Sequence, residues 1–488
     1  MGTISSAFSL ISGALDADQS ALSIVANNVA NANTTGYTRE TPNWQQNAPI
    51  EINGIFYGTG VTETGPSSVR DRVLEGRLAQ QQQLASASGA RLSSLNTLQA
   101  LFTPDSGAAN ATAGDIGSDI TGFFSSFSSL EANPTNNALR QQVLSTASTL
   151  AGDISNAAAS LTSQKSALDQ EAAGVTSQVN ALTSAIAQLN LQIQSATGGG
   201  AAGPLEDQRQ QDLNQLSQLI GINQISTENN GFSITTTSGQ LLVSEGTSIS
   251  LKIGTLGGVT HFFAGTTDVT AELATGGGQL GGYLTARDQD IPNVISSLDQ
   301  LAYGITIEVN AQNSAGTDLN GASGTAIFNQ SPTVLGSAAN MSVVMTDPNQ
   351  IAAATSGQGT GDNSNATAMA NLANLANPPI LSGLTLPDGT TLVSGQTLLN
   401  SQTPTNYYSS FVTALGSTIS HVQTENTAQS ASVSQLQTQR DSLSSVNLND
   451  EAAMMQKLER SYQAASQVFT MLNTIMGAAL NLGVQTAV

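Results

Sequence analysis

Apolar residues recur with alternating spacings of four and three residues at both ends of the chain. Near the N-terminus only Asp18 interrupts the run, whose members are Ile4, Phe8, Ile11, Leu15, Leu22, Val25 and Val29. Near the C-terminus the uninterrupted run is Met455, Leu458, Tyr462, Ala465, Phe469, Leu472, Met476 and Ala479. This spacing places one narrow apolar stripe on a helix, as in helices that pair in a coiled coil. The pattern predicts that the termini meet and that the middle of the chain is inserted between them.

The first helix also carries a second apolar face, formed by Leu10, Ala14, Ala17, Ala21 and Ile24. A unit of two helices, each of about 30 residues, cannot shield both faces of the first helix. We therefore expect neighbouring subunits to cover the second face, so that the terminal pair packs between molecules as well as within one. For the central helices, an ordinary intramolecular bundle is the favoured interpretation.

The first helix is expected to cover about residues 3–32. The same spacing predicts further helices over about residues 74–102, 136–195 (as a pair), 280–313 and 407–443, and 207–219 reads as a short helix. Residues 103–135 break the helical pattern. An extended segment over 38–68 contains Asn53-Gly54, a dipeptide typical of a hairpin turn. Turn residues alternate with short β-type runs through 222–275, and residues 316–400 read as loops and short strands.

These elements predict a mainly α fold with inserted β (α+β), in which terminal coiled-coil helices and a helical bundle carry antiparallel β insertions. The expected domains are a terminal assembly domain (1–38 with 445–488), a helical bundle (39–221 with 276–315 and 400–444), a β insertion (222–275) and a β- and loop-rich insertion (316–399).

Composition narrows the possible functions. The chain has 13 Lys and Arg against 34 Asp and Glu, a net charge of −21, and no basic stripe. Nucleic acid and anionic membrane surfaces are therefore not expected partners. The absence of cysteine excludes disulfides and thiolate sites. The N-terminus lacks the basic and apolar regions of a secretory signal peptide, and no run is long enough for a transmembrane helix.

Candidate chemical motifs are weak. Gly276-x-Gly278-x-x-Gly281 fits a dinucleotide fingerprint, but its flanks are turns rather than a βαβ unit, so a hinge is the better interpretation. Asp318-Leu319-Asn320-Gly321 reads as a tight turn rather than a calcium loop. His261, in an expected strand, and His421, on the last long helix, have no evident His, Cys or carboxylate partner. We predict no cofactor, no metal site and no catalytic residues, and hence no enzyme.

Two terminal motifs carry a family resemblance. The run Ala26-Asn27-Asn28-Val29-Ala30-Asn31-Ala32-Asn33-Thr34-Thr35-Gly36-Tyr37 resembles the N-terminal signature of bacterial flagellar rod, hook and hook-associated proteins. Residues 446–465 resemble the C-terminal motif of the same axial family. Residues 283–288, 291–292, 298–302, 308–310 and 318–321 are similar to the hook-associated members found at the hook–filament junction.

The resemblance implies a structural protein that forms a ring between hook and filament. The implied partners are further copies of the chain, the hook protein, a second junction protein, the flagellin filament, and a cytoplasmic export chaperone on the C-terminal helix. It implies secretion through the flagellar type III apparatus without a cleavable signal peptide. The alternatives are a hook or rod subunit of the same family and, less favoured, a secreted adhesin or enzyme with a helical stalk.

Within this resemblance, we predict an assembly interface on the terminal helices and on the N-terminal signature. Its residues are Ile4, Phe8, Ile11, Leu15, Leu22, Val25, Val29, Asn27, Asn28, Asn31, Gly36, Met455, Leu458, Tyr462, Phe469, Leu472 and Met476.

Overall fold

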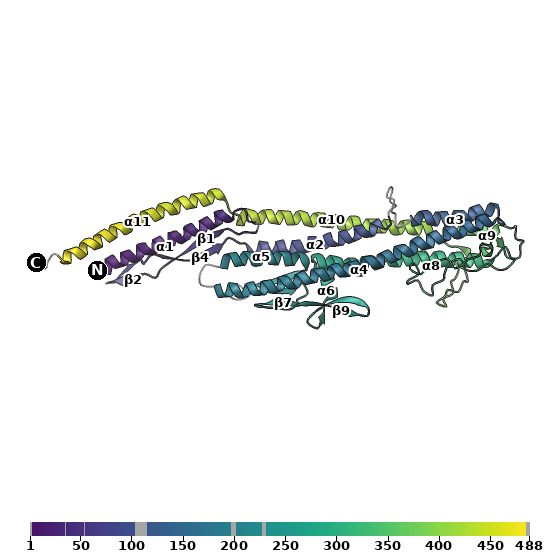
Figure 1. The fold of residues 1–488 in the computed structure, drawn as a ribbon, viewed down its shortest axis with the longest axis horizontal. Helices are drawn as coiled ribbons and strands as arrows, with labels where there is room; N and C mark the ends of the chain where they lie inside the picture. Colours follow the sequence, from purple (N-terminus) through teal and green to yellow (C-terminus); the bar gives the residue numbers. More distant parts are fainter. Residues whose placement is uncertain are drawn as a thin grey trace. The chain divides into compact units, whose positions relative to one another are not determined.

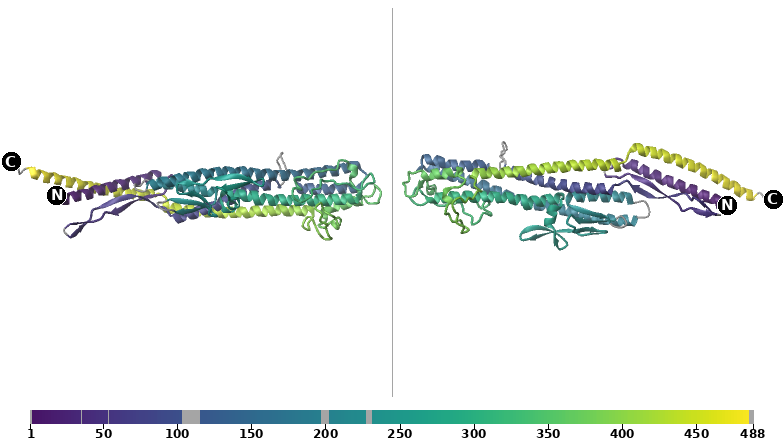
Figure 2. Two further views of the ribbon diagram at one scale, coloured as in Figure 1. Left: turned by 90° about the horizontal axis from the view of Figure 1, so that it is seen from below. Right: turned by 180° about the vertical axis from the view of Figure 1, so that it is seen from behind.

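The fold is known from a computed structural model that describes residues 2–34, 36–52, 54–102, 115–196, 202–226 and 231–484. The chain divides into two compact units (Figures 1 and 2). Unit 1 comprises residues 1–86, 175–278 and 428–488, and unit 2 comprises residues 87–174 and 279–427. The fold is mainly α with small antiparallel sheets, which confirms the predicted class.

In unit 1, the two terminal helices lie side by side (Figure 1). They are α1 (Gly2–Asn31) and α11 (Leu448–Val484). A long antiparallel ribbon follows α1, built from β1 (Glu40–Gln46) and β4 (Val61–Ser68) and continued by β2 (Ile50–Ile52) and β3 (Ile55–Tyr57). The predicted hairpin is therefore present, and Gly54 takes the positive φ of 77° that its turn requires; Asn53 lies outside the described residues.

Three long helices contribute residues to both units. They are α2 (Arg72–Ala100), α4 (Asn137–Ala196) and α10 (Pro404–Ser444). The predicted pair of helices over 136–195 was wrong, because α4 is one helix of 60 residues. No proline interrupts it, and alanine, glutamine and leucine favour its continuation. The short helix α5 (Ala202–Leu219) begins earlier than predicted.

The predicted break over 103–135 was partly wrong, because this range contains α3 (Ile116–Ala132). Residues 103–114 lie outside the described part of the chain. Asp115 caps the helix by accepting a hydrogen bond from the amide of Gly117 at 3.1 Å. Five of its seven buried residues follow the spacings of four and three, namely Ile116, Ile120, Phe123, Phe127 and Leu130; the other two are Phe124 and Ser126.

The β insertion of unit 1 holds two antiparallel sheets, as predicted. One has the order β5 (Ile222–Ser226), β6 (Phe232–Thr236), β7 (Leu241–Ser244), β8 (Thr247–Ser248). The other has the order β11 (Thr267–Asp268), β10 (Val259–Ala264), β9 (Leu251–Leu256). The insertion ends in α6 (Thr270–Gly276), where strands were expected. Its two ends meet, because the amide of Gly221 donates to the carbonyl of Gly277 at 3.1 Å.

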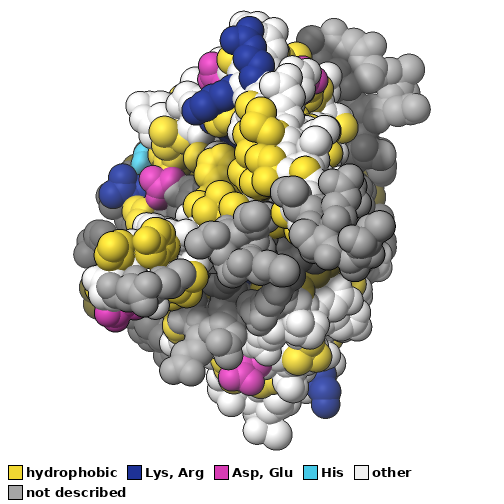
Figure 3. Space-filling model, turned by 90° about the vertical axis from the view of Figure 1, so that its left-hand side faces the viewer, with side chains coloured by type: hydrophobic (Ala, Val, Ile, Leu, Met, Phe, Trp, Pro, Cys, Tyr) yellow, Lys and Arg dark blue, Asp and Glu magenta, His cyan; other side chains and the backbone are white. Residues whose placement is uncertain are grey.

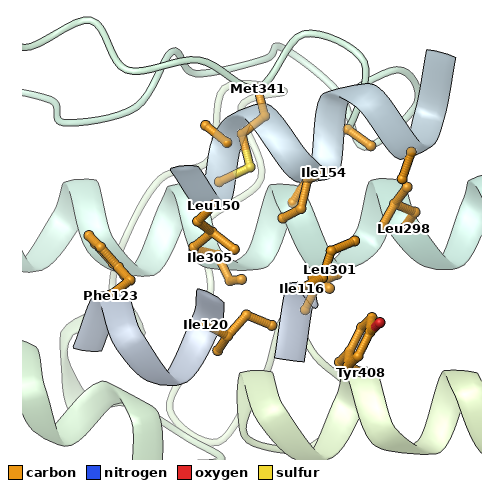
Figure 4. Packing of buried hydrophobic residues seen from close by; sticks show 14 of the residues in the cluster. Ile116, Ile120, Phe123, Leu150, Ile154, Leu298, Leu301, Ile305, Met341 and Tyr408 are labelled. Carbon is orange, nitrogen blue, oxygen red and sulfur yellow. The ribbon is translucent and has the colours of Figure 1, made fainter. Parts of the chain in front are cut away.

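Unit 2 contains a large apolar core, to which α3, α4, α8 (Ile291–Ala315) and α10 contribute side chains (Figure 4). Phe123 is fully buried and makes ring contacts with Phe124, Phe127 and Phe328. Ile305 and Leu301 of α8, Leu150 of α4 and Tyr408 of α10 point into the same space (Figure 4). Close packing of this kind makes each of these side chains sensitive to truncation.

The expected helix over 280–313 has three parts: α7 (Gly278–Thr285), the π-helical turn η2 (Ala286–Asp290) and α8. Residues of the π turn form two sets of ion pairs. Arg287, almost fully buried, pairs with Asp169 and Asp288, and Asp290 makes a bidentate pair with Arg91 at 2.8 Å. Asp288 and Asp290 are therefore structural ion-pair partners.

Residues 316–400 contain the short strands β12 (Gly316–Thr317) and β13 (Ala354–Thr355) among loops, as predicted. They also contain the unpredicted helix α9 (Ser364–Asn371) and the 3₁₀ turns η3 (Pro348–Gln350), η4 (Leu372–Asn374) and η5 (Pro379–Leu381). The finer division into four domains stays a prediction.

Candidate assembly interface

The terminal helices form an antiparallel seam. Phe8 of α1 lies against Phe469 of α11 with ring centroids 4.5 Å apart. Further along, Ala21 and Val25 are buried with Leu458, and Leu22, Met454 and Met455 pack around them. The contacts thus pair early residues of α1 with late residues of α11, as an antiparallel pair requires. The prediction that the chain termini meet is confirmed.

The seam is only partly shielded within one chain. Ala21, Val25 and Leu458 are buried, whereas the other described apolar members of the predicted interface are half-buried or exposed. The half-buried members are Phe8, Ile11, Leu15, Leu22, Met455, Phe469, Leu472 and Met476. Val29 and Tyr462 are 39% and 38% exposed. The side chain of Ile4 lies outside the described set. The predicted stripe therefore keeps apolar surface in contact with solvent.

The second apolar face of α1 packs in part against the chain's own ribbon, and the expectation that neighbouring subunits cover this face stays a prediction. Ala17 and Ile24 are buried, Ala21 is buried with Leu458 in the seam, and Leu10 and Ala14 are half-buried. Gly13 and Gly60 lie at this contact: a Cβ on Gly13 would lie 3.6 Å from the carbonyl oxygen of Val61, which is an ordinary van der Waals distance. The ribbon was predicted, but its packing against α1 depends on contacts between distant residues that a periodic pattern does not reveal.

A buried polar node closes the seam where α1 ends. Asn28 is fully buried and donates to the carbonyl of Glu40 at 2.8 Å and to Glu451 Oε2 at 3.1 Å. Its own Oδ1 accepts from the Glu40 amide at 3.0 Å and from the Tyr37 hydroxyl at 2.8 Å. All the hydrogen-bonding atoms of one amide are therefore used. Asn28 therefore links α1 to the start of β1 and to α11. Its contact with Glu451 joins two residues that are 423 positions apart in sequence.

Charge reinforces this node. Arg39 Nε donates to Glu451 Oε1 at 2.6 Å, so each oxygen of the buried Glu451 carboxylate has one partner. Burial, assisted by Asp207 and Glu206, raises the pKa of Glu40 above its usual range. Burial and the nearby carboxylates of Glu40, Asp207 and Glu451 also raise the pKa of Tyr37, which keeps its hydroxyl protonated as a donor to Asn28.

A second polar contact ties the segment after α1 to α5. The amide of Thr38 donates to Asp207 Oδ2 at 3.0 Å, and Arg70 pairs with the other oxygen of Asp207. The segment after α1 is therefore fixed on both sides, by Glu451 of α11 and by Asp207 of α5.

The remaining members of the N-terminal signature have local roles. Asn27 accepts from the Asn31 amide group at 2.8 Å, and both bonds of this pair lie on the exposed side of α1. Gly36 has a φ of 82°, and a Cβ there would lie 2.6 Å from Gln211. Glycine is needed because the backbone is left-handed and close to α5. Of the signature residues, the structure thus brings Asn28 and Tyr37 into the seam.

The other candidate motifs are structural. Asp318 Oδ1 accepts from the amides of Asn320 and Ala322 at 2.8 Å, which confirms the predicted tight turn. His261 lies in β10 as expected, but its Nδ1 is 2.7 Å from Asp268 Oδ2, so the expectation of no carboxylate partner was wrong. Strand pairing that brings β11 beside β10 creates this exposed pair. Among the described residues no group of three or more His, Asp or Glu side chains is placed to hold a metal ion.

Sequence reasoning missed Glu451 and Arg39, which hold the node together. Both residues lie within or beside the terminal motifs, but nothing in the order of residues pairs position 39 with position 451. The available signal was a pair of acidic residues, Asp450 and Glu451, in the first turn of α11 and a single arginine, Arg39, shortly after the Asn-rich end of α1. None of the described helices is both long and apolar enough to cross a membrane.

The class of protein that this fold defines is a mainly α chain whose N- and C-terminal helices pair and are closed by a buried polar node. Flagellar proteins are similar to this chain. Residues 105–328 match the family described as "Flagellar hook-associated protein FlgK helical domain", and residues 11–38 match "Flagella basal body rod protein". Flagellar hook-associated protein 1 of Escherichia coli (strain K12) is 26% identical, with 96% of this chain and 98% of the relative covered. The Bacillus subtilis (strain 168) protein of that name is 25% identical, with 96% of each covered.

The structure of the flagellar hook junction protein FlgK from Burkholderia pseudomallei shares the fold, with a TM-score of 0.62 and 19% identity, covering 75% of this chain and all of that one. Over almost its whole length, the chain is therefore similar to flagellar hook-associated protein 1 of several bacteria. Its role is structural, at the hook–filament junction of the bacterial flagellum.

Proposed function

We propose that the antiparallel α1–α11 seam is the element that builds the chain into a junction ring. The observation that carries this proposal is that the seam is closed by a fully buried node at Asn28 while most of its apolar stripe stays half-buried. The node fixes the geometry of the helix pair, and the uncovered stripe supplies surface that association with other copies would remove from water. All of the predicted interface residues except Gly36 belong to these two helices.

The partners proposed for the assembled state are further copies of the chain within the ring, the hook protein on one side, and a second junction protein with the flagellin filament on the other. Before export, a cytoplasmic chaperone would cover the apolar stripe of α11. The protein would leave the cell and act outside it, with a structural rather than an enzymatic role and no cofactor.

A single charge placed in the seam tests the proposal. Phe469→Asp puts an unpaired carboxylate against Phe8, at a cost of several kcal/mol once that contact is sealed. We expect the variant to be exported in normal amounts while hooks lack filaments. Gln463→Asp, at an exposed position of the same helix, is the matched control and should support normal filaments. Normal swimming of cells that carry only Phe469→Asp would refute the proposal.

A further inference from the structure

A second apolar stripe on α11 is separate from the seam. Lys457, Arg460, Ala464, Val468, Met471 and Ile475 are spaced by three or four residues and are all exposed; we call them the outer stripe. This spacing places them on one face of the helix, turned away from Leu458 and Phe469. Met471 is 63% exposed. The face is basic at its N-terminal end and wholly apolar beyond Ala464.

The end of the β-ribbon has the complementary character. Ile50, Glu51, Ile55, Phe56 and Tyr57 are exposed on β2 and β3, and we call them the hairpin tip. Glu51 and Phe56 face each other across the two strands, so a carboxylate and a 69% exposed ring lie on the same side of the ribbon. No Lys or Arg occurs between Arg39 and Arg70. The hairpin tip is therefore apolar and acidic, whereas the outer stripe is apolar and basic.

The two surfaces lie on different layers of unit 1. Helix α1 lies between α11 and the ribbon (Figures 1 and 2), and it contacts both. The seam side of α1 carries Phe8 and Val25, while Gly13 and Ser20 meet the ribbon. Figure 3 shows one face of the molecule on which hydrophobic side chains gather beside Lys and Arg side chains. Each copy thus presents both surfaces uncovered.

We propose that the hairpin tip of one copy docks on the outer stripe of α11 of the next copy. This inference rests on the proposed function and names the contact through which the ring grows. Phe56 would pack against Ala464 and Val468, with Glu51 directed toward Arg460 and Lys457 on the preceding turns of α11. Because the two surfaces differ, the contact is heterologous, and repetition gives a closed ring or a helical row rather than a closed dimer.

The absence of native cysteine allows a direct cross-linking test. Phe56→Cys and Val468→Cys are placed together in one full-length chain, which is expressed in cells lacking the native protein. Flagella are isolated and mildly oxidised. We expect a ladder of covalent multimers, because a disulfide needs Cα atoms within about 7 Å of each other and each copy offers both halves of the contact. Phe56→Cys with Gln463→Cys, on another face of α11, is the control and should give no ladder.

Charge exchange provides a second test that does not depend on cysteines. Glu51→Lys alone and Lys457→Glu with Arg460→Glu should each lower the number of filaments per cell several-fold. The three changes combined should restore much of the loss, because the reversed charges attract again. Restoration is the decisive readout, since a merely misfolded variant would not be rescued by a second change on another element.

The outcomes separate this inference from the proposed function. If the cysteine variant sits at the hook tip and cells swim, yet no ladder forms and charge exchange gives no rescue, the docking contact is wrong while the seam proposal stands. Dimers that do not extend would point to an isologous contact and would also overturn the inference. A disulfide from Phe56→Cys to another flagellar protein would assign the hairpin tip to a foreign partner instead. Absence of the wild-type chain from the hook tip would refute the proposed function itself.

Discussion

The terminal seam of unit 1 and the core of unit 2 are both built from apolar residues at helical spacing, but they bury them to different extents. In the unit 2 core, Phe123, Leu150, Leu301 and Ile305 are fully buried. In the seam, Ala21, Val25 and Leu458 are buried, while Phe469 and Leu472 are not. The same spacing therefore gives fully buried side chains in the core of unit 2 and half-buried side chains in the terminal seam. This difference supports the proposal that the terminal pair is completed by assembly, whereas the core of unit 2 is complete within one chain.

The largest effect on the isolated chain is expected in the unit 2 core. Phe123→Ala removes a fully buried ring that contacts three other phenylalanines, and its cost to the free energy of unfolding is about 3–5 kcal/mol. Phe469→Ala in the half-buried seam should cost only about 1 kcal/mol in the isolated chain. Denaturant unfolding of both purified variants measures the difference. Equal losses would remove the distinction between the two regions.

Glu308 adds a pH dependence to unit 2. Its side chain on α8 is 2% exposed, Oε2 has no hydrogen-bond partner among the residues that the structure describes, and burial raises its pKa from 4.5 to about 8. The folded chain therefore holds a proton that the unfolded chain releases above about pH 4.5, so this residue's contribution to stability falls as pH rises from about 4.5 to 8.

Glu308→Gln keeps the shape and removes the titration. We expect it to raise stability at pH 8 by on the order of 1–3 kcal/mol and to change stability little near pH 5. Thermal unfolding across this pH range, compared with the unaltered chain, checks the sign. A variant less stable than the parent at pH 8 would show that the carboxylate has a partner in the folded state.

The polar node should give an intermediate effect confined to unit 1. Asn28→Ala leaves the Tyr37 hydroxyl, the Glu40 amide and one oxygen of Glu451 without their partner, at a cost of about 1–3 kcal/mol. Protease resistance of the α1–α11 pair should fall while that of unit 2 stays unchanged. Asn27→Ala, at an exposed position, is the matched control. Loss of protection in both variants alike would mean that the node does not lock the seam.

The seam was accessible from sequence because periodicity alone predicts a helical stripe, and opposite ends with matching stripes suggest a pair. The polar node could not be predicted from sequence, because the contact between Asn28 and Glu451 spans 423 positions and depends on the fold. Helix α3 was missed although its phenylalanines follow the helical spacing, since the glycines and serines around them suggested a loop. The outer stripe of α11 was not predicted, because the seam stripe on the same helix is the longer uninterrupted apolar pattern. Periodicity predicted which helices form, but not which of their faces the chain itself covers.

Hydrogen exchange of the isolated chain and of the assembled junction tests the central claim most directly. In the isolated chain, amides of α1 and α11 should exchange much faster than those of α3 and α8, because the seam lacks cover from neighbouring copies. In the assembled junction, protection of the terminal helices should rise to the level of the unit 2 core. Terminal helices that are as protected in the isolated chain as α3 and α8, with no gain on assembly, would contradict the account.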